Sequence, residues 1–168
     1  MNHASALMTS ELIREAVDIA RLSILELLRI SDHAKPVFVY VVVLSPFERD
    51  DPNDPFGVLY ERVIGEFFLD DADVNERKHR YRAIAHSKAV ISRRTQMDTG
   101  AVAVVCPALF DGGDTHYEGG AIVAGIPVGT SGVESFLDEA VSRIIASTIN
   151  ALIKQELKKR RDNKDAFL

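Results

Sequence analysis

The chain has 168 residues, of which 46% are hydrophobic and 27% charged, a balance that is ordinary for a globular protein with a real core. Its formal net charge of −5 excludes a general electrostatic attraction to nucleic acid or to an anionic membrane surface. The longest uninterrupted apolar run, Val37–Leu44, is too short to cross a bilayer as a helix, so we expect neither nucleic acid nor a membrane as a partner.

The first predicted element is a helix over Ser10–Ile30, because apolar residues recur there at three- and four-residue spacing. Its apolar face is wider than one stripe, so we expect the sheet to cover one side of it and a partner subunit the other. Val37–Leu44, rich in β-branched and aromatic residues, is predicted as a central strand. After a loop over Ser45–Gly57, Val58–Leu69 resumes strand character, interrupted by Gly65, and the two strands are expected to pair antiparallel.

A second helix is predicted over Val74–Arg94, with the acidic residues Asp70–Asp73 at its start and a glycine stop at Gly100. The apolar run Ala101–Leu109 is then predicted as a third strand. The glycine-rich stretch His116–Gly132 is expected to supply a fourth. The second helix would therefore lie between the two pairs of strands in the sequence.

The last helix is predicted to begin at Gly132 or Val133, where Ser131 and Glu134 fit a capping box. The charged tail from Lys158 is expected to fray. The order helix, two strands, helix, two strands, helix predicts an α+β fold with an antiparallel sheet flanked by helices. We treat the chain as a single domain whose core covers residues 9–155.

The N-terminal sequence and the cysteine content indicate the cellular compartment. Residues 1–16 lack the basic segment and the continuous apolar run of a signal peptide. Cys106 is the single cysteine, so it can form no internal disulfide and cannot build a zinc site by itself, and we expect it to be a small buried hydrophobic residue. A cytoplasmic protein is the simplest interpretation.

The glycine-rich stretch fails the tests for three common motifs. A Walker loop needs a lysine after its last glycine, a dinucleotide loop needs G-x-G-x-x-G, and a nucleophile elbow needs G-x-S-x-G with a later histidine. Gly129-Thr-Ser-Gly132 satisfies none of them, and all five histidines precede Ser131. Two interpretations remain. The backbone N–H groups of residues 131–133 could bind an anion, or Ser131 and Glu134 could simply cap the helix.

The middle helix is basic although the whole chain is acidic, since Arg77–Arg94 holds seven basic residues and no acidic one. These cations could face the carboxylates of a ligand, the acidic loop Asp50–Asp54, or solvent. His79 and His86 lie about 10 Å apart along the helix axis, too far for one metal ion, so no metal site is expected. Either could be the axial ligand of a haem or another macrocycle, or an ordinary surface histidine. The basic residues are Arg77, Lys78, Arg80, Arg82, Lys88, Arg93 and Arg94.

Three polar side chains, His116, Tyr117 and Glu118, stand directly before the double glycine Gly119-Gly120. Such a cluster at the entrance to a strand forms either the edge of a pocket or a plain turn. If the protein is an enzyme, His116 and Glu118 are the candidates for its acid or base.

The segments KAVISRRTQMDTG, YEGGAIVAG, IPVGTSG and DEAV, in this order, resemble the GlcG/HbpS-like family, which includes the PduO C-terminal domain. The short family motifs fall on Lys88-Ala89, Gly119-Gly120, Ser131-Gly132 and Asp138. The resemblance extends over residues 9–149. It implies a profilin-like antiparallel sheet flanked by helices, homo-oligomers and, in some members, the binding of haem or corrinoid-like macrocycles.

Two positions depart from the family pattern. Glu118 stands where relatives often carry histidine or a small residue. Pro127 lies inside the predicted final strand, where it removes a backbone donor and suggests an edge or a bulge.

Together these observations predict an oligomeric domain that binds a small ligand, either haem, a related macrocycle or a small organic anion. The pocket would lie between the middle helix and the turns at His116–Gly120 and Gly129–Gly132. One alternative is an enzyme acting on a small organic acid or a tetrapyrrole; another is an interaction module without a ligand, assembled through its first helix. The expected ligand contacts are Arg77, His79, Arg80, His86, Tyr117, Gly119, Gly120, Ser131 and Gly132.

Overall fold

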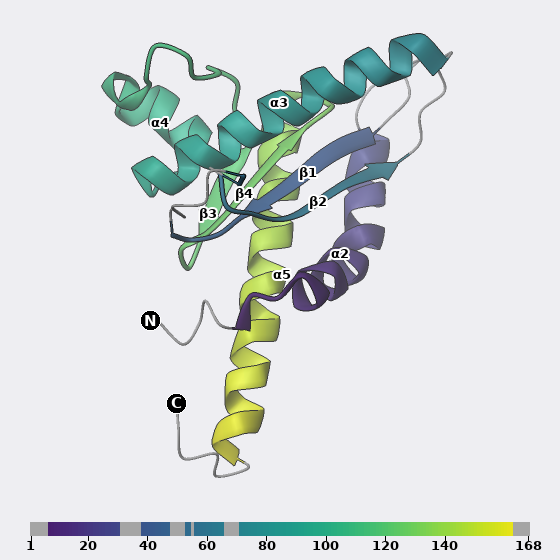
Figure 1. The fold of residues 1–168 in the computed structure, drawn as a ribbon, viewed down its shortest axis with the longest axis vertical. Helices are drawn as coiled ribbons and strands as arrows, with labels where there is room; N and C mark the ends of the chain where they lie inside the picture. Colours follow the sequence, from purple (N-terminus) through teal and green to yellow (C-terminus); the bar gives the residue numbers. More distant parts are fainter. Residues whose placement is uncertain (1–6, 31–37, 48–52, 55, 66–70, 163–168) are drawn as a thin grey trace.

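The computed structural model describes residues 7–30, 38–47, 53–54, 56–65 and 71–162. The predicted α+β class is confirmed: helices pack on a four-stranded antiparallel sheet with strand order β2-β1-β4-β3 (Figure 1). The elements are α2 (Ser10–Ile30), β1 (Phe38–Leu44), β2 (Val58–Gly65), α3 (Asp71–Thr95), α4 (Thr99–Val105), the 3₁₀ turn η1 (Pro107–Leu109), β3 (Gly120–Val123), β4 (Ile126–Ser131) and α5 (Ser135–Asp162).

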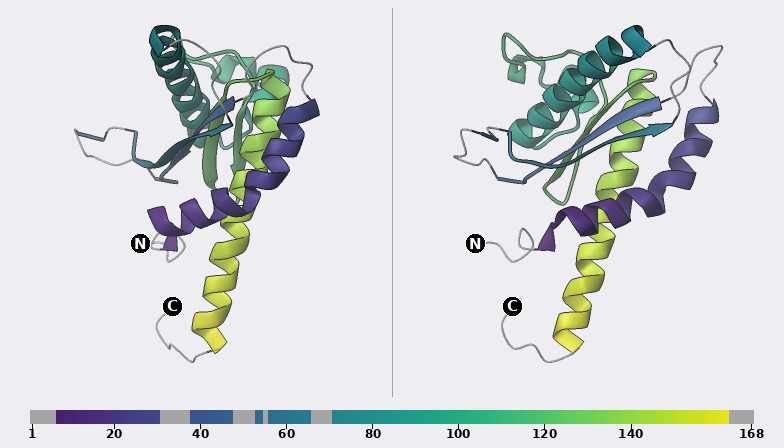
Figure 2. Two further views of the ribbon diagram at one scale, coloured as in Figure 1. Left: turned by 90° about the vertical axis from the view of Figure 1, so that its right-hand side faces the viewer. Right: turned by 45° about the vertical axis from the view of Figure 1, so that its right-hand side comes forward.

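β1 is a continuous apolar run because both of its faces are covered. Val39, Val41 and Val43 pack into the core formed with α2 and α5, whereas Val42 and Leu44 pack against α3. Figures 1 and 2 show this arrangement, with α3 on one face of the sheet and α2 and α5 on the other. A strand that is buried on both faces has apolar residues at successive positions, so its sequence does not alternate between apolar and polar residues.

The predicted pairing of the first two strands is confirmed. β1 and β2 run antiparallel, with Val42 opposite Glu61 and Phe38 opposite Gly65. β2 ends at Gly65, whose φ of 102° lies in the left-handed region that favours glycine. The further strand residues predicted up to Leu69 lie outside the described residues, as do Val37, residues 50–52 of the acidic loop and Asp70.

The predicted third strand over Ala101–Leu109 is wrong, because these residues form α4 and η1. The helix starts with the bond from the Val102 N–H to the Asp98 carbonyl, and Val102 is its one buried valine, while Val104 is 81% exposed. A short apolar run fits a strand and a helix equally well by its period, which explains the error. Cys106 is half-buried rather than buried, since it follows the exposed end of α4.

The glycine-rich stretch forms both remaining strands, β3 and β4, where we predicted one. Ala124 and Gly125, with φ angles of 51° and 79°, make a two-residue hairpin turn between them. Pro127 lies in an interior strand, which corrects the expectation of an edge there. It is tolerated because β4 pairs with β1 only from Val128 onward, so Pro127 faces no β1 partner. Along the chain, the order is therefore α2, then β1 and β2, then the helical elements α3, α4 and η1, then β3 and β4, and finally α5.

The last helix starts later than predicted, at Ser135, and Ser131 is the final residue of β4. The predicted capping box at Ser131 and Glu134 is therefore wrong. Asp138, one turn into the helix, accepts the Val133 N–H through Oδ1 at 3.3 Å instead. The helix continues to Asp162, so the fraying predicted from Lys158 does not begin there; residues 163–168 lie outside the described part.

α2 packs on β2 and α5 and leaves Ile19 and Leu22 exposed on its outer side. The lower half of α5 extends beyond the sheet (Figure 2). In the described part of the chain, no helix combines the length and the apolar character needed to cross a membrane.

Candidate functional site

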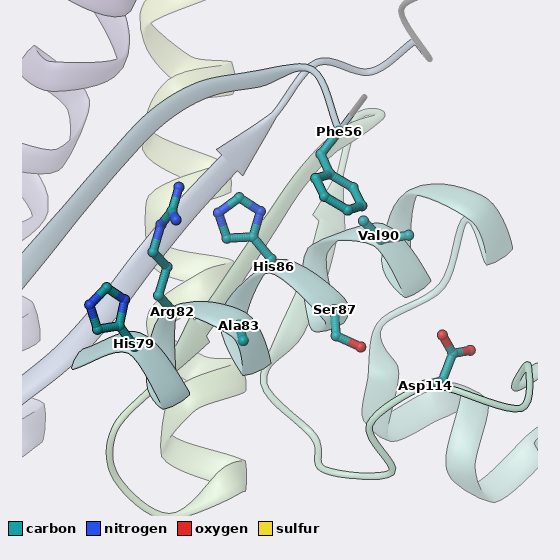
Figure 3. Close-up of a pocket in the computed structure, with 8 residues that line it drawn as sticks. All are labelled: Phe56, His79, Arg82, Ala83, His86, Ser87, Val90 and Asp114. Carbon is teal, nitrogen blue, oxygen red and sulfur yellow. The ribbon is translucent and has the colours of Figure 1, made fainter. Parts of the chain in front are cut away.

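Two pockets open along α3, one on each side of the helix. The first, which we call the α5 pocket, has a volume of about 340 Å³ and is lined by Arg80, Tyr81, Ile84, Lys88, Tyr117, Ser131, Val133, Ser135 and Asp138. The second, the His86 pocket, has a volume of about 430 Å³ (Figure 3) and is lined by Phe56, His79, Arg82, Ala83, His86, Ser87, Val90 and Asp114. Residues four apart on α3 share a face, so the helical period assigns its side chains to one pocket or the other.

An ion pair between Lys88 and Asp138 lies in the wall of the α5 pocket. Lys88 Nζ donates to Asp138 Oδ2 at 2.9 Å and to the Thr130 carbonyl oxygen at 2.9 Å. The two charged side chains are 1% and 2% exposed. The pair ties α3, β4 and α5 together at one point. Ser142 extends the polar network by donating to the Gly119 carbonyl at 2.7 Å.

Burial is the largest influence on both members of this pair. It lowers the pKa of Lys88 and raises the pKa of Asp138, while the attraction between the two charges acts in the opposite direction. Each charge is tolerated inside the protein because the other faces it.

Glycine at position 119 is required by the approach of Lys88. Its φ is +127°, and a Cβ built there would lie 2.5 Å from Lys88 Nζ and 2.7 Å from Asp138 Cβ. Gly129 is crowded in the same way, because a Cβ would lie 2.0 Å from the Ala85 carbonyl oxygen. Gly119 and Gly129 therefore allow the β3–β4 hairpin to lie against α3.

A second polar cluster stands beside the His86 pocket, centred on the Glu61 carboxylate of β2. Arg82 donates to it twice, from Nε and Nη2, both at 2.8 Å. Tyr40 donates its hydroxyl at 2.5 Å, and His86 Nε2 lies 2.8 Å from Oε1. These contacts, with Arg82 first, lower the pKa of Glu61 to about 2. Burial, together with Glu61, raises the pKa of Tyr40 to about 12.

The structure divides the predicted ligand contacts between the two pockets. Arg80, Tyr117 and Ser131 line the α5 pocket, and His79 and His86 line the His86 pocket. The remaining contacts line neither: Arg77 is exposed, Gly119 and Gly120 are buried against α3, and Gly132 follows β4 close to the Phe38 backbone.

The candidates for acid–base chemistry also lie apart from both pockets. The exposed His116 ring stacks, tilted, on Phe110 with 4.9 Å between the ring centroids. Glu118 is half-buried, and its Cγ approaches Gly100. Neither lines the α5 pocket or the His86 pocket, although Tyr117 between them does line the α5 pocket.

Sequence reasoning placed Lys88 and Asp138 in family motifs but did not predict that they meet. A signal was present, because Asp138 lies one helical turn before Val141 and Ser142 on the buried face of α5. The Glu61 cluster was also missed. Glu61 is the one acidic residue of β2, but nothing local in the sequence shows which side chains it faces.

Within the described ranges, no group of three His, Cys, Asp or Glu side chains is placed to hold a metal ion. Comparison with known proteins adds nothing to this picture, since no protein-family model matches the sequence and no curated protein does either.

Proposed function

We propose that this protein is a ligand-binding domain of the GlcG/HbpS type that takes a small organic anion in the α5 pocket. The observation that carries the proposal is the position of Arg80, which lines the pocket with no acidic partner among the described residues. Among the residues that line the pocket, the Asp138 charge is balanced by Lys88, so Arg80 is the charged lining side chain left over.

Hydrogen-bond donors surround that charge. The hydroxyl groups of Tyr117, Ser131 and Ser135 line the pocket, and α5 begins there at Ser135. The N-terminal end of a long helix carries partial positive charge and favours an anion, although the Asp138 carboxylate already accepts the Val133 N–H at this end. A volume of about 340 Å³ suits a small carboxylate.

Family membership is part of the same proposal. The motif residues Lys88, Gly119, Ser131 and Asp138 come from distant parts of the sequence, and all lie at or beside the α5 pocket. Homo-oligomers and a cytoplasmic location belong to the proposal as well. The exposed Ile19 and Leu22 on α2 are the residues that we would place in a subunit contact.

A titration with small acids tests the anion site. We expect acetate, glycolate or malonate to raise the melting temperature saturably, and acetamide to have no effect. Arg80→Gln should weaken binding by tenfold or more, whereas Arg77→Gln, on the same helix but outside both pockets, should not. Equal binding of acetate and acetamide, or equal effects of the two arginine variants, would contradict the proposal.

Haem is a second candidate, supported by the two histidines that line one pocket. His86 Nε2 is already in contact with Glu61, so the exposed His79 is the more accessible iron ligand. A Soret band on mixing the protein with hemin, lost in His79→Ala, would support haem binding. The enzyme alternative with His116 or Glu118 is tested by turnover of small organic acids in His116→Ala and Glu118→Gln.

A further inference from the structure

His86 is held in one tautomer by the groups around Glu61. The Glu61 carboxylate is ionised at neutral pH, so it accepts hydrogen bonds and donates none. Arg82 and Tyr40 supply three of its donors, and the contact with His86 Nε2 at 2.8 Å then requires a proton on that nitrogen. In neutral His86 the other nitrogen, Nδ1, therefore carries a lone pair.

Nδ1 has no hydrogen-bond partner in the part of the chain that the structure describes, and it is buried. Figure 3 shows one ring nitrogen of His86 toward Arg82 and the other toward Phe56. The Phe56 ring lies with its centroid 5.8 Å from that of His86 and has no polar atom to offer. A buried acceptor without a donor is unusual in a folded protein.

Phe56 can act as a movable cover for this nitrogen. The residue is 47% exposed, although phenylalanine is normally buried. Its backbone carbonyl is fixed by a 2.9 Å hydrogen bond from Arg93 Nη1, so the ring can change rotamer without movement of the chain. Such a rotation would uncover Nδ1 to the His86 pocket.

Apart from the exposed His79, the polar side chains of the pocket are already engaged. Ser87 Oγ accepts the Thr115 N–H at 3.2 Å, and Asp114 Oδ2 accepts from Arg94 at 2.6 Å. The charges of Arg82 and Asp114 are each balanced by a partner, Glu61 and Arg94. The walls at Ala83 and Val90 are apolar. The pocket therefore offers one unused buried acceptor, His86 Nδ1, in neutral, largely apolar surroundings.

We propose that the His86 pocket binds a small neutral aromatic molecule whose O–H or N–H group, as in a phenol or an azole, donates a hydrogen bond to His86 Nδ1. The aromatic ring of the ligand packs against Phe56, Ala83 and Val90. This site is separate from the anion site, since the two pockets share no lining residue.

Phenol and anisole form a matched pair of probes, because anisole has a similar ring and lacks the donor. Nitrogen-15 NMR of the histidine rings first reports the tautomer of His86 in the free protein, which should carry its proton on Nε2. Phenol should then shift the His86 Nδ1 resonance saturably and bind about tenfold more tightly than anisole, the contribution of one hydrogen bond. His86→Phe should remove this preference, whereas His79→Gln, at the rim, should retain it.

A proton on Nδ1 in the free protein would overturn the proposal. So would equal affinities for phenol and anisole, or a phenol titration that leaves the Nδ1 resonance in place. If His86→Phe does not fold, the comparison of phenol with anisole on the unaltered protein decides the question. Failure here leaves the anion proposal intact, because that proposal is read from acetate binding and from Arg80.

Discussion

Lys88 on α3 and Asp138 on α5 are separated by 50 residues in the sequence, and their charged groups lie 2.9 Å apart inside the protein. Buried pairs of this kind are expensive to break, because removal of one charge leaves the other without a partner. The pair therefore makes the packing of α3 against α5 sensitive to single substitutions.

Lys88→Met should lower the free energy of unfolding by about 3–5 kcal/mol, because Asp138 then stays buried without a cation. Urea denaturation measures this change. The double variant Lys88→Met, Asp138→Leu should recover part of the loss, since neither charge remains. Lys154→Met, at an exposed position of α5, is the control and should change stability by less than about 0.5 kcal/mol. A Lys88→Met protein as stable as this control would contradict a structural role for the pair.

Gly119→Ala should destabilise the protein by about 1–3 kcal/mol or more, because the new methyl group meets Lys88 Nζ and the backbone φ of +127° is strained for alanine. Gly113→Ala is the matched control, since a Cβ there has no neighbour within 4 Å. Thermal unfolding of the two variants provides the comparison. Equal melting temperatures would show that the hairpin does not lie this close to α3.

The pH dependence of stability should contain a contribution from Glu61. Its pKa is lowered to about 2 in the folded protein, below its ordinary value of 4.5. The unfolded chain therefore takes up a proton first, and the stabilisation, complete above pH 4.5, is lost as the pH falls toward 2. The stability difference between the unaltered protein and Glu61→Gln should be constant near neutral pH and shrink in acid. A difference that is independent of pH from 7 to 3 would rule out the ionised cluster.

Tyr40 should ionise later than an ordinary tyrosine, because burial and Glu61 raise its pKa to about 12. The folded state thus favours the neutral phenol, and this contribution to stability is lost as the pH rises above 10. An ultraviolet titration of tyrosinate should show a late component that Tyr40→Phe removes. The late component should persist in Tyr117→Phe, a substitution at an exposed position outside the Glu61 cluster.

The sequence pattern was sufficient where local periodicity and burial agree. The apolar run of β1, the long helical stripe of α5 and the antiparallel pairing of β1 with β2 were all predictable from it. The pattern failed over Ala101–Leu109, because a short run of valine and alanine has no period that separates a helix from a strand. It also failed at the hairpin, where Ala124 takes a left-handed φ, because alanine is not a residue type that predicts such a turn.

The two pockets were harder to predict for a different reason. His79 and Arg80 are neighbours in the sequence and were assigned to one site, yet they line different pockets because consecutive residues of a helix point about 100° apart. The partners of Lys88 and Glu61 come from other elements, and no local pattern encodes such contacts.

The placement of both pockets along one helix has a consequence for anyone who dissects them by mutation. A substitution on α3 that shifts the helix would alter both sites, so variants from other elements, Tyr117 or Ser135 for one pocket and Phe56 or Asp114 for the other, provide independent checks. By the same geometry, a ligand that displaces α3 from one side changes the affinity of the opposite side. Thermodynamic linkage would make any such influence equal in both directions.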